Sequence, residues 1–589
     1  MAEFHNPQNE PGSEKRMMLV FLIAFGALAL MRYLVPSPPA APPPKQPAQQ
    51  QQSAPSSSPA SSSPSSSVNP KQPSAVPVKK ADREAETVVE NQLYRIVFSS
   101  RGALVKSWVL KKYNDDQGKP LDLVNATTAP VVGYPLSFFA YDHELEQKLN
   151  QALYVPSAVG AQEAPAVLSF EFAEGDISVR KTFSFDLASY VVDIETEVTD
   201  KGRAVTAYPA WPGGLGDQTA PAAYAASRID WEQNGNVERN APQSGWLLTG
   251  KKWVIGGQTY GGPFEWVAAV DQYFTAAFMP NDPGHTAVVT LNHPVDIGAN
   301  TNTGSKSDAP KTEAAVLGVA VGGVNGSTHE RLFVGPKSVD VLEKTQAQPG
   351  GPDLRQVVDF GFFKWIARPL FAWLEWTHDH WINNWGWTIA FATLVISLAL
   401  LPLRISSIKS SLKMQKIQPQ VKAITEKYKR YSITDPRRAD MQKEMSELYR
   451  REGVNPVGGC FPLLLQMPFL FAFYSMLGNA TELRQAHWMW VHDLSAPDPW
   501  HILPLGIIVT MFLTQKSTPQ AGMDPMQQKM LSFMTPLMLG FISWNLAAGV
   551  GIYWAISNFI GYGQQFFMNR TQFGQQVRKS VDRRATRKK

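Results

Sequence analysis

The chain has 589 residues and a formal net charge of +5, so it can hold several domains, and the placement of its charges is more informative than their sum. Its one cysteine, Cys460, excludes an intramolecular disulfide and any metal site built on cysteine ligands. Mean hydropathy is near neutral because polar segments offset apolar ones, so the order of the segments carries the information.

Residues 1–35 contain an apolar run, Met17 to Met31, that follows two basic residues. A basic flank, a short apolar core and small residues such as Ala40 are typical of a cleaved signal peptide. An uncleaved anchor needs about 20 apolar residues, which this run reaches only if Arg32 extends to the interface. In both interpretations the segment that follows is exported.

Two exported regions that differ in composition and in hydrophobic pattern are expected next. Residues 36–85 are rich in Pro, Ser and Gln and predict a disordered linker. Residues 86–350 predict an all-β domain, because Phe183, Phe185 and the run Tyr190–Val198 alternate with polar residues as in a hairpin with one wet face. Further strands are expected at Leu93–Phe98, Val167–Phe172, Trp266–Phe278 and Ala314–Val321. Their short spacing favours a β-sandwich.

The last third of the chain predicts membrane helices. Phe360–His378 is amphipathic and aromatic, is interrupted by Pro369, and should lie in the interface plane. Five spans are expected at Trp385–Leu403, Phe461–Gly478, Ile502–Gln515, Met530–Leu546 and Val550–Met568. Gly and Pro inside several of them are tolerated in membrane helices.

Basic loops set the orientation. Lys409 to Arg451 contains 12 Lys and Arg against 5 Asp and Glu, and the tail 569–589 is also strongly basic, whereas the loop 479–499 carries more acidic than basic residues. Basic loops stay in the cytoplasm. This predicts six crossings with both termini inside and the β domain outside.

The segment 405–453 predicts two antiparallel cytoplasmic helices with basic outer faces. Its cations and those of the tail are candidates for contact with anionic lipid headgroups, ribosomal RNA or an acidic partner. These residues are Lys409, Lys413, Lys416, Arg437, Arg438, Arg583, Arg584 and Lys588. The alternative is a solvated face that only obeys the charge rule for cytoplasmic loops.

Polar residues recur at helical spacing in the predicted spans. Thr393, Ser397 and Arg404 share one face if Pro402 does not break the helix. The last span repeats this spacing with Tyr553, Ser557 and Gln564, beside Trp554, Asn558 and Gln565, and Gln466 adds an amide to another span. Such residues either hydrogen-bond between helices or line a hydrated groove, and their number on several helices favours the groove.

No enzymatic site emerges from the sequence. His487, His492 and His501 lie near Asp493 and Ser495, but no nucleophile elbow accompanies them. No histidines stand at metal-ligand spacing, and there is no phosphate-binding glycine loop. We therefore expect no catalysis, no metal, no cofactor and no small-molecule substrate. A transporter or channel remains the alternative, although neither inverted repeats nor a path through both leaflets is visible.

Six motifs of the helical region stand out together: Asn384-Trp385-Gly386, Pro402-Leu403, Val454 to Pro468, Glu482 to Ala486, His492 to Ser495 and Asp524 to Lys529. Through these motifs the chain resembles the YidC-type membrane protein insertases of the Gram-negative, six-span kind. The exported region matches more weakly, at Trp266 to Pro280 and Leu332 to Pro336.

The resemblance implies a fold and a function. The fold is a polytopic α-helical membrane protein, with a five-helix insertase core over 359–568, an uncleaved anchor helix and a large exported β-sandwich. The function is the integration and folding of nascent proteins of the bacterial inner membrane through a groove open to the cytoplasm. It works without ATP, alone or beside the Sec translocon, with ribosomes delivering substrates. The apolar part of a substrate leaves between two helices along Phe469, Phe473, Phe533 and Met534.

One position departs from the family pattern. The family carries a groove arginine where this chain has Ser397, whereas Thr393 and Tyr553 match neighbouring groove residues and Trp554 stands where a tyrosine is usual. We hypothesise that Arg404, nearer the cytoplasm, supplies the charge instead. The alternative is that Arg404 is an ordinary basic flank of its span.

Overall fold

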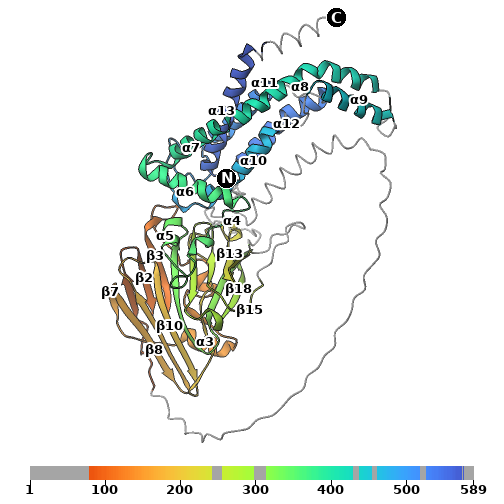
Figure 1. The fold of residues 1–589 in the computed structure, drawn as a ribbon. Helices are drawn as coiled ribbons and strands as arrows, with labels where there is room; N and C mark the ends of the chain where they lie inside the picture. Colours follow the sequence, from red (N-terminus) through yellow and green to blue (C-terminus); the bar gives the residue numbers. More distant parts are fainter. Residues whose placement is uncertain are drawn as a thin grey trace, which may run out of the picture.

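The computed structural model describes residues 78–219, 221–241, 255–297, 313–428, 431, 437–453, 461–517, 525–572 and 575. These residues form a β domain and a helical domain that meet end to end (Figure 1). The predicted anchor in residues 1–35 and most of the predicted linker lie outside the described residues.

Three sheets build the β domain. The first has the order β4 (Pro120–Asp122), β3 (Leu104–Asn114), β2 (Tyr94–Ser99), β1 (Glu86–Glu90) and β7 (Gly160–Glu163). The second has the order β14 (Asn236–Asn240), β13 (Arg228–Gln233), β16 (Trp266–Val270), β17 (Phe274–Pro280), β20 (Ser327–Pro336), β10 (Val191–Asp200), β9 (Ile177–Phe185), β8 (Ala166–Glu174) and β6 (Val155–Pro156), with β11 (Arg203–Ala204) paired to β10. The third has the order β15 (Gln258–Gly261), β18 (Thr286–Asp296), β19 (Glu313–Gly323), β12 (Tyr208–Trp211) and β5 (Ser137–Phe139).

Short helices connect the strands. They are α2 (Ala129–Val132), α3 (His143–Gln151), α4 (Pro221–Ala225) and α5 (Val339–Glu343), with the 3₁₀ turns η2 (Pro283–His285) and η3 (Leu354–Val357).

Buried aromatic rings join the sheets face to face. Phe98 on β2 lies 5.0 Å from Phe183 on β9, and Trp108 on β3 lies 5.9 Å from Trp211 on β12, measured between ring centroids. All four side chains are fully buried. Their area removed from water explains why the alternating pattern seen in the sequence folds into a sandwich.

The predicted hairpin is confirmed: β9 and β10 pair antiparallel, with Ile194 opposite Phe183. The apolar stretch Trp266–Phe278 forms two strands, β16 and β17, rather than one. The Asp271 carboxylate accepts the backbone N–H groups of Tyr273 and Phe274 at 2.7 and 2.6 Å, which stabilises the tight turn between them.

The helical domain contains α6 (Lys364–His380), α7 (Trp385–Ala399), α8 (Leu401–Tyr428), α9 (Arg437–Arg451), α10 (Phe461–Asn479), the turn η5 (Thr481–Leu483), α11 (Ile502–Ser517), α12 (Pro525–Ser543) and α13 (Ala548–Arg570). The interruption predicted at Pro369 is wrong, because α6 continues through it. Pro369 lies within the second turn of α6, where it removes one intrahelical hydrogen bond without ending the helix.

A bend separates α7 from α8. The two helices meet at Leu400 at an angle of 59°, and together they have the length and apolarity of a membrane span. Within the described part of the chain no single helix meets that standard alone, and α11 and the 532–543 part of α12 are shorter apolar helices. Pro402 lies at the start of α8, where its missing N–H donor favours a helix break.

Helices α8 and α9 form the predicted hairpin, which projects away from the β domain (Figure 1). Met414, Ile417, Val421 and Leu448 bury a shared apolar seam between them. Because α8 runs unbroken from Leu401 to Tyr428, the hairpin and the bundle share one helix.

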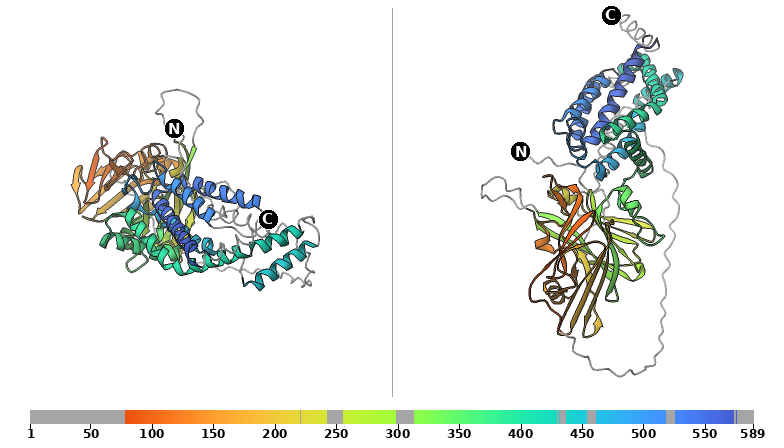
Figure 2. Two further views of the ribbon diagram at one scale, coloured as in Figure 1. Left: turned by 90° about the horizontal axis from the view of Figure 1, so that it is seen from above. Right: turned by 90° about the vertical axis from the view of Figure 1, so that its left-hand side faces the viewer.

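The helical domain lies against one end of the β domain (Figure 2), and specific polar contacts around η5 join the two. Gln272 donates to the carbonyl of Gly478 at 2.9 Å, and Thr481 donates to the carbonyl of Tyr273 at 3.0 Å. The Arg484 guanidinium donates to the carbonyl of Asn114 at 2.5 Å, and only 8% of its side chain is exposed. The β domain is therefore docked directly on the helical domain.

Candidate functional site

A cluster of polar side chains joins α8, α10 and α13. Arg404 is in the first turn of α8, just after the bend, and its backbone N–H donates to the carbonyl of Leu400 at 3.0 Å. Its Nη2 donates to Gln466 Oε1 on α10 at 2.5 Å, and its Nη1 donates to Gln564 Oε1 on α13 at 3.3 Å. The guanidinium is therefore held by two neutral amide oxygens.

Gln466 connects Arg404 to the hydroxyls of α13. Its Nε2 lies 2.8 Å from both the Tyr553 hydroxyl and Ser557 Oγ. The Oε1 toward the cation and the Nε2 toward the hydroxyls fix the orientation of the amide. We call Arg404, Gln466, Tyr553, Ser557 and Gln564 the Arg404 cluster.

The cluster carries a net positive charge. Among the described residues no carboxylate forms an ion pair with Arg404, and none belongs to the cluster. The guanidinium is partly exposed, whereas Tyr553 and Ser557 are buried. A cation held only by neutral groups keeps its attraction for an incoming negative charge.

Space for the guanidinium comes from a glycine on α13. A Cβ added at Gly561 would lie 3.0 Å from Arg404 Nη1, which is closer than ordinary van der Waals contact. Gly561 was not expected from the sequence, because its role depends on a side chain from another helix.

The other predicted groove residues lie apart from the cluster. Thr393 is buried and donates to the carbonyl of Ile389 on its own helix at 2.7 Å, and Ser397 is buried without a described bond to Arg404. Trp554 is also buried, and the Asn558 amide nitrogen is buried without a described partner.

The expectation that Thr393, Ser397 and Arg404 share one continuous helical face is wrong. It required an unbroken helix, and the chain bends by 59° at Leu400. The bend turns α8 away from the axis of α7, so the helical spacing does not continue across it. Arg404 nevertheless reaches α10 and α13.

The four predicted slide residues differ in exposure. Phe533 and Met534 on α12 are exposed by 59% and 56%, and Phe469 on α10 is partly buried. Phe473 is fully buried and stacks on Tyr553 with 3.9 Å between ring centroids. Phe473 therefore packs against Tyr553 of the Arg404 cluster and is not exposed along the predicted exit route.

The predicted surface cations are placed in part. Lys409, Lys413 and Lys416 are exposed along α8, and Arg437 is exposed at the start of α9, where its guanidinium lies 4.1 Å from the Tyr431 ring. The side chain of Arg438, and Arg583, Arg584 and Lys588 in the tail, lie outside the described residues.

In the loop that contains the hydrolase-like residues, the aspartates accept hydrogen bonds that stabilise the fold of the loop. Asp493 accepts from the Ser495 backbone N–H at 2.8 Å and from its hydroxyl at 2.7 Å. Asp498 accepts from Trp490, Trp500 and Leu503. Among the described residues no group of three or more His, Cys, Asp or Glu is arranged to hold a metal ion.

Buried charge also shapes the end of the β domain that faces this loop. Burial raises the pKa of the Asp217 carboxyl well above its usual value, and the neighbouring Asp271 raises it further, whereas Arg484 opposes both. Arg484 thus contacts the β domain next to a pair of buried carboxyls.

Two family models match the chain. One, described as "60Kd inner membrane protein", covers residues 376–576, and one described as "YidC periplasmic domain" covers residues 86–373. The chain is similar to a "Membrane protein insertase YidC" of Syntrophus aciditrophicus, at 30% identity over 86% of this chain and 88% of that protein. It is 32% identical to the protein of the same description from Geobacter sulfurreducens, over 81% of this chain and 85% of that one. A crystal structure described as an active YidC insertase with its first transmembrane domain resolved matches 84% of this chain and 95% of its own, at 19% identity and a TM-score of 0.34.

Proposed function

Because the chain belongs to the YidC family of membrane protein insertases, which act in the inner membrane on newly made membrane proteins, we propose that it integrates these clients through a groove whose polar wall is the Arg404 cluster. The observation that carries this proposal is the Arg404 guanidinium, held between α10 and α13 by Gln466 and Gln564 without a carboxylate partner among the described residues.

The cluster lowers the cost of moving a polar segment into the membrane. An ionised side chain at the bilayer centre costs about 2.5–3.5 kcal/mol on insertion scales. In the proposed groove, Arg404, Gln466 and Ser557 would offer such a segment hydrogen bonds and a positive charge part of the way across. Partition of the client's apolar segment into lipid then drives the step.

The apolar segment leaves between α10 and α12. Among the described residues α10 packs mainly on α6 and α13, whereas α12 packs mainly on α11, so α10 and α12 make little direct contact with each other. The exposed Phe533 and Met534 on α12, with Phe469 on α10, provide an apolar surface along this route. Phe473 is not part of this surface, because its ring stacks on that of Tyr553.

Orientation follows from the basic segments. Cytoplasmic placement of 409–451 and of the basic tail puts both termini inside and the β domain in the exported compartment. The exposed Lys409, Lys413 and Lys416 then face ribosomes and anionic headgroups, and the chain works alone or beside the Sec translocon. The proposed mechanism uses no covalent chemistry and no cofactor, and Ser495 and Asp493, the hydrolase-like residues, hydrogen-bond to each other within a turn.

The test is insertion into proteoliposomes without nucleotide, using a small two-span client with an exported tail that carries either two Asp or two Asn. Arg404→Ala should reduce integration of the acidic client several-fold and that of the neutral client less. Lys443→Ala removes an exposed cation from the neighbouring helix α9 and should match the wild-type protein.

Each other outcome is decisive. Wild-type integration of the acidic client by both Arg404→Ala and Arg404→Lys removes Arg404 from the mechanism. Ion leakage without integration indicates a channel, and cleavage of the client indicates a hydrolase.

A further inference from the structure

The β domain contains a pocket at the end that lies away from the helical domain. Strand β17 begins beside Tyr273, which contacts the helical domain, and runs seven residues to Pro280 at the pocket. The pocket holds about 240 Å³ between the turn around Asp282 and the β19–β20 hairpin. This is several times the roughly 30 Å³ that one water molecule occupies in the liquid, so a chain of several heavy atoms fits.

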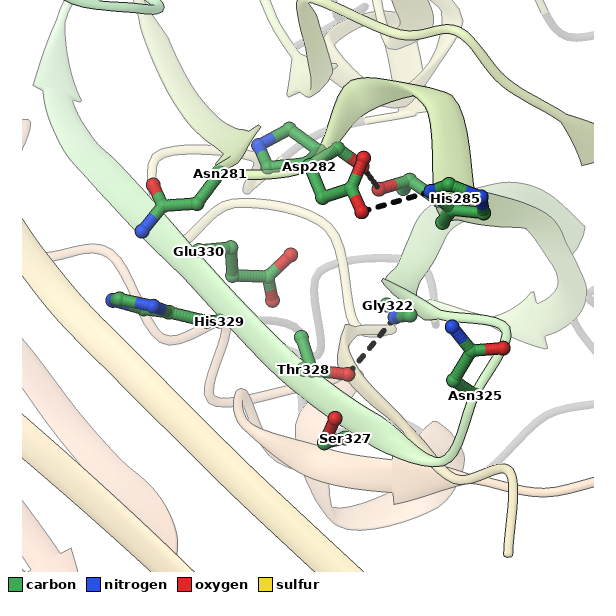
Figure 3. Close-up of a pocket in the computed structure, with 12 residues that line it drawn as sticks. Asn281, Asp282, His285, Gly322, Asn325, Ser327, Thr328, His329 and Glu330 are labelled. Atoms are coloured by element: carbon green, nitrogen blue, oxygen red, sulfur yellow. Dashed lines mark hydrogen bonds and ion pairs between the residues drawn. The ribbon is translucent and has the colours of Figure 1, made fainter. Parts of the chain in front are cut away.

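A buried carboxyl points into this pocket. Glu330 lies on β20, between Ile194 of β10 and Pro280 of β17, and has no exposed surface. Both of its carboxyl oxygens lack a hydrogen-bond partner among the described residues. Figure 3 shows the side chain directed into the space between Asp282 and Thr328.

Three other buried carboxylates in the same domain have at least one partner each. Glu232 accepts from the Trp266 indole at 2.8 Å, and Asp271 accepts two backbone N–H groups. Asp230 pairs with Arg228 at 3.1 Å. An unpartnered buried carboxyl destabilises the fold relative to an apolar residue of similar size, so a structural role does not account for Glu330.

The lining favours a cation. Asp282, His285 and His329 are the other titratable groups that line the pocket, and no Lys or Arg lines it within the described part of the chain. The Asp282 carboxylate lies 2.9 Å from His285 Nδ1, and both side chains are mostly exposed at the mouth. The Thr328 hydroxyl accepts the Gly323 N–H at 3.1 Å and retains its own proton as a donor.

We propose that this pocket binds a compact primary alkylammonium group, whose N–H donors pair with the Glu330 carboxylate inside and with Asp282 at the mouth. Burial raises the pKa of Glu330 well above its usual value, which favours the neutral form of the unliganded carboxyl. The arriving cation reverses that preference, and the carboxyl releases its proton to solvent. The ammonium belongs either to a free polyamine or to a lysine side chain of an exported polypeptide.

Titration calorimetry on the full chain in detergent tests the proposal with putrescine, with the peptide N-acetyl-Ala-Lys-Ala-amide and with glucose as a neutral polyol. Binding of putrescine alone identifies a free amine as the ligand, and binding of the peptide identifies a lysine side chain. Glu330→Gln should weaken either interaction at least tenfold, and Asp282→Asn several-fold.

Glu174→Gln is the matched control, because it removes an exposed carboxylate from the same domain and should leave binding unchanged. Glu330→Gln loses no described hydrogen bond, and the unchanged melting temperature of the variant will show that it folds. Absence of amine binding, equal binding by Glu330→Gln, or binding of glucose alone overturns the proposal.

Discussion

The Nη2 atom of Arg404 and the Oε1 atom of Gln466 are 2.5 Å apart, across the interface between α8 and α10. A charge-assisted hydrogen bond of this length orients both side chains. Because the acceptor is an amide, the bond positions the guanidinium without cancelling its charge.

Gln466→Glu should convert this contact into an ion pair. The new carboxylate would neutralise Arg404 and repel an acidic client, so insertion of a client with an acidic tail should fall about tenfold, with a smaller effect on a neutral tail. Integration into proteoliposomes measures this difference. Gln466→Met keeps the size of the side chain without the charge, and equal behaviour of the two variants contradicts the electrostatic explanation.

Gly561→Ala tests the space reserved for the guanidinium. The added Cβ would lie 3.0 Å from Arg404 Nη1 and should displace it, reducing insertion of the acidic client several-fold. Gly563 on the same helix has nothing within 4 Å of an added Cβ, so Gly563→Ala is the matched control and should retain activity. If both variants insert clients normally, the position of the guanidinium does not matter.

Arg484→Ala should loosen the contact between the two domains. The side chain is mostly buried, donates to Asn114 and lies over the rings of Phe274 and Tyr273. Loss of a hydrogen bond from a charged donor costs about 1.5–3 kcal/mol. Hydrogen exchange in residues 112–118 should become faster. Arg101→Ala removes an exposed ion pair of the β domain and should leave that exchange rate unchanged.

Lys181 predicts a pH-dependent stability of the β domain. Its ammonium is buried and donates to the carbonyls of Gly102, Ala103 and Leu136, and burial lowers its pKa to about 7. Between pH 7 and 10 the unfolded chain binds more protons at this site than the folded chain, so stability rises with pH.

The expected contribution is on the order of 1 kcal/mol per pH unit between pH 7 and 9. Denaturant unfolding of the wild-type protein and of Lys181→Met, compared over this range, isolates that slope from those of other groups. Parallel stability curves for the two proteins contradict the prediction.

The outward cations of α8 should govern binding to ribosomes. Replacing Lys409, Lys413 and Lys416 with Gln removes three exposed charges while preserving helix propensity. Cosedimentation with ribosomes should weaken and its dependence on salt should become less steep. Equal binding by the variant and the wild-type protein assigns these lysines to solvation of the hairpin.

The sequence predicted those parts of the site that depend on local spacing. Tyr553, Ser557 and Gln564 recur at helical intervals, and all three join the Arg404 cluster. Alternation of apolar residues likewise predicted the β9–β10 hairpin. In both cases the pattern repeats within one element, so neighbouring residues suffice to reveal it.

Features that depend on contact between distant segments could not be predicted. The room at Gly561 and the stacking of Phe473 on Tyr553 each require the positions of other helices. The same holds for Glu330. From the sequence it is an ordinary polar residue of a strand, and its burial depends on the neighbouring strands β10 and β17.

The unbroken course of α8 has a mechanical consequence. Its 28 residues form a rod about 40 Å long, with Arg404 near one end and the seam shared with α9 near the other. Because α8 continues through Pro419 as one helix, a load that tilts the hairpin should also displace the guanidinium. Binding of a partner at the tip of the hairpin should therefore change the position of the guanidinium that is proposed to receive the client.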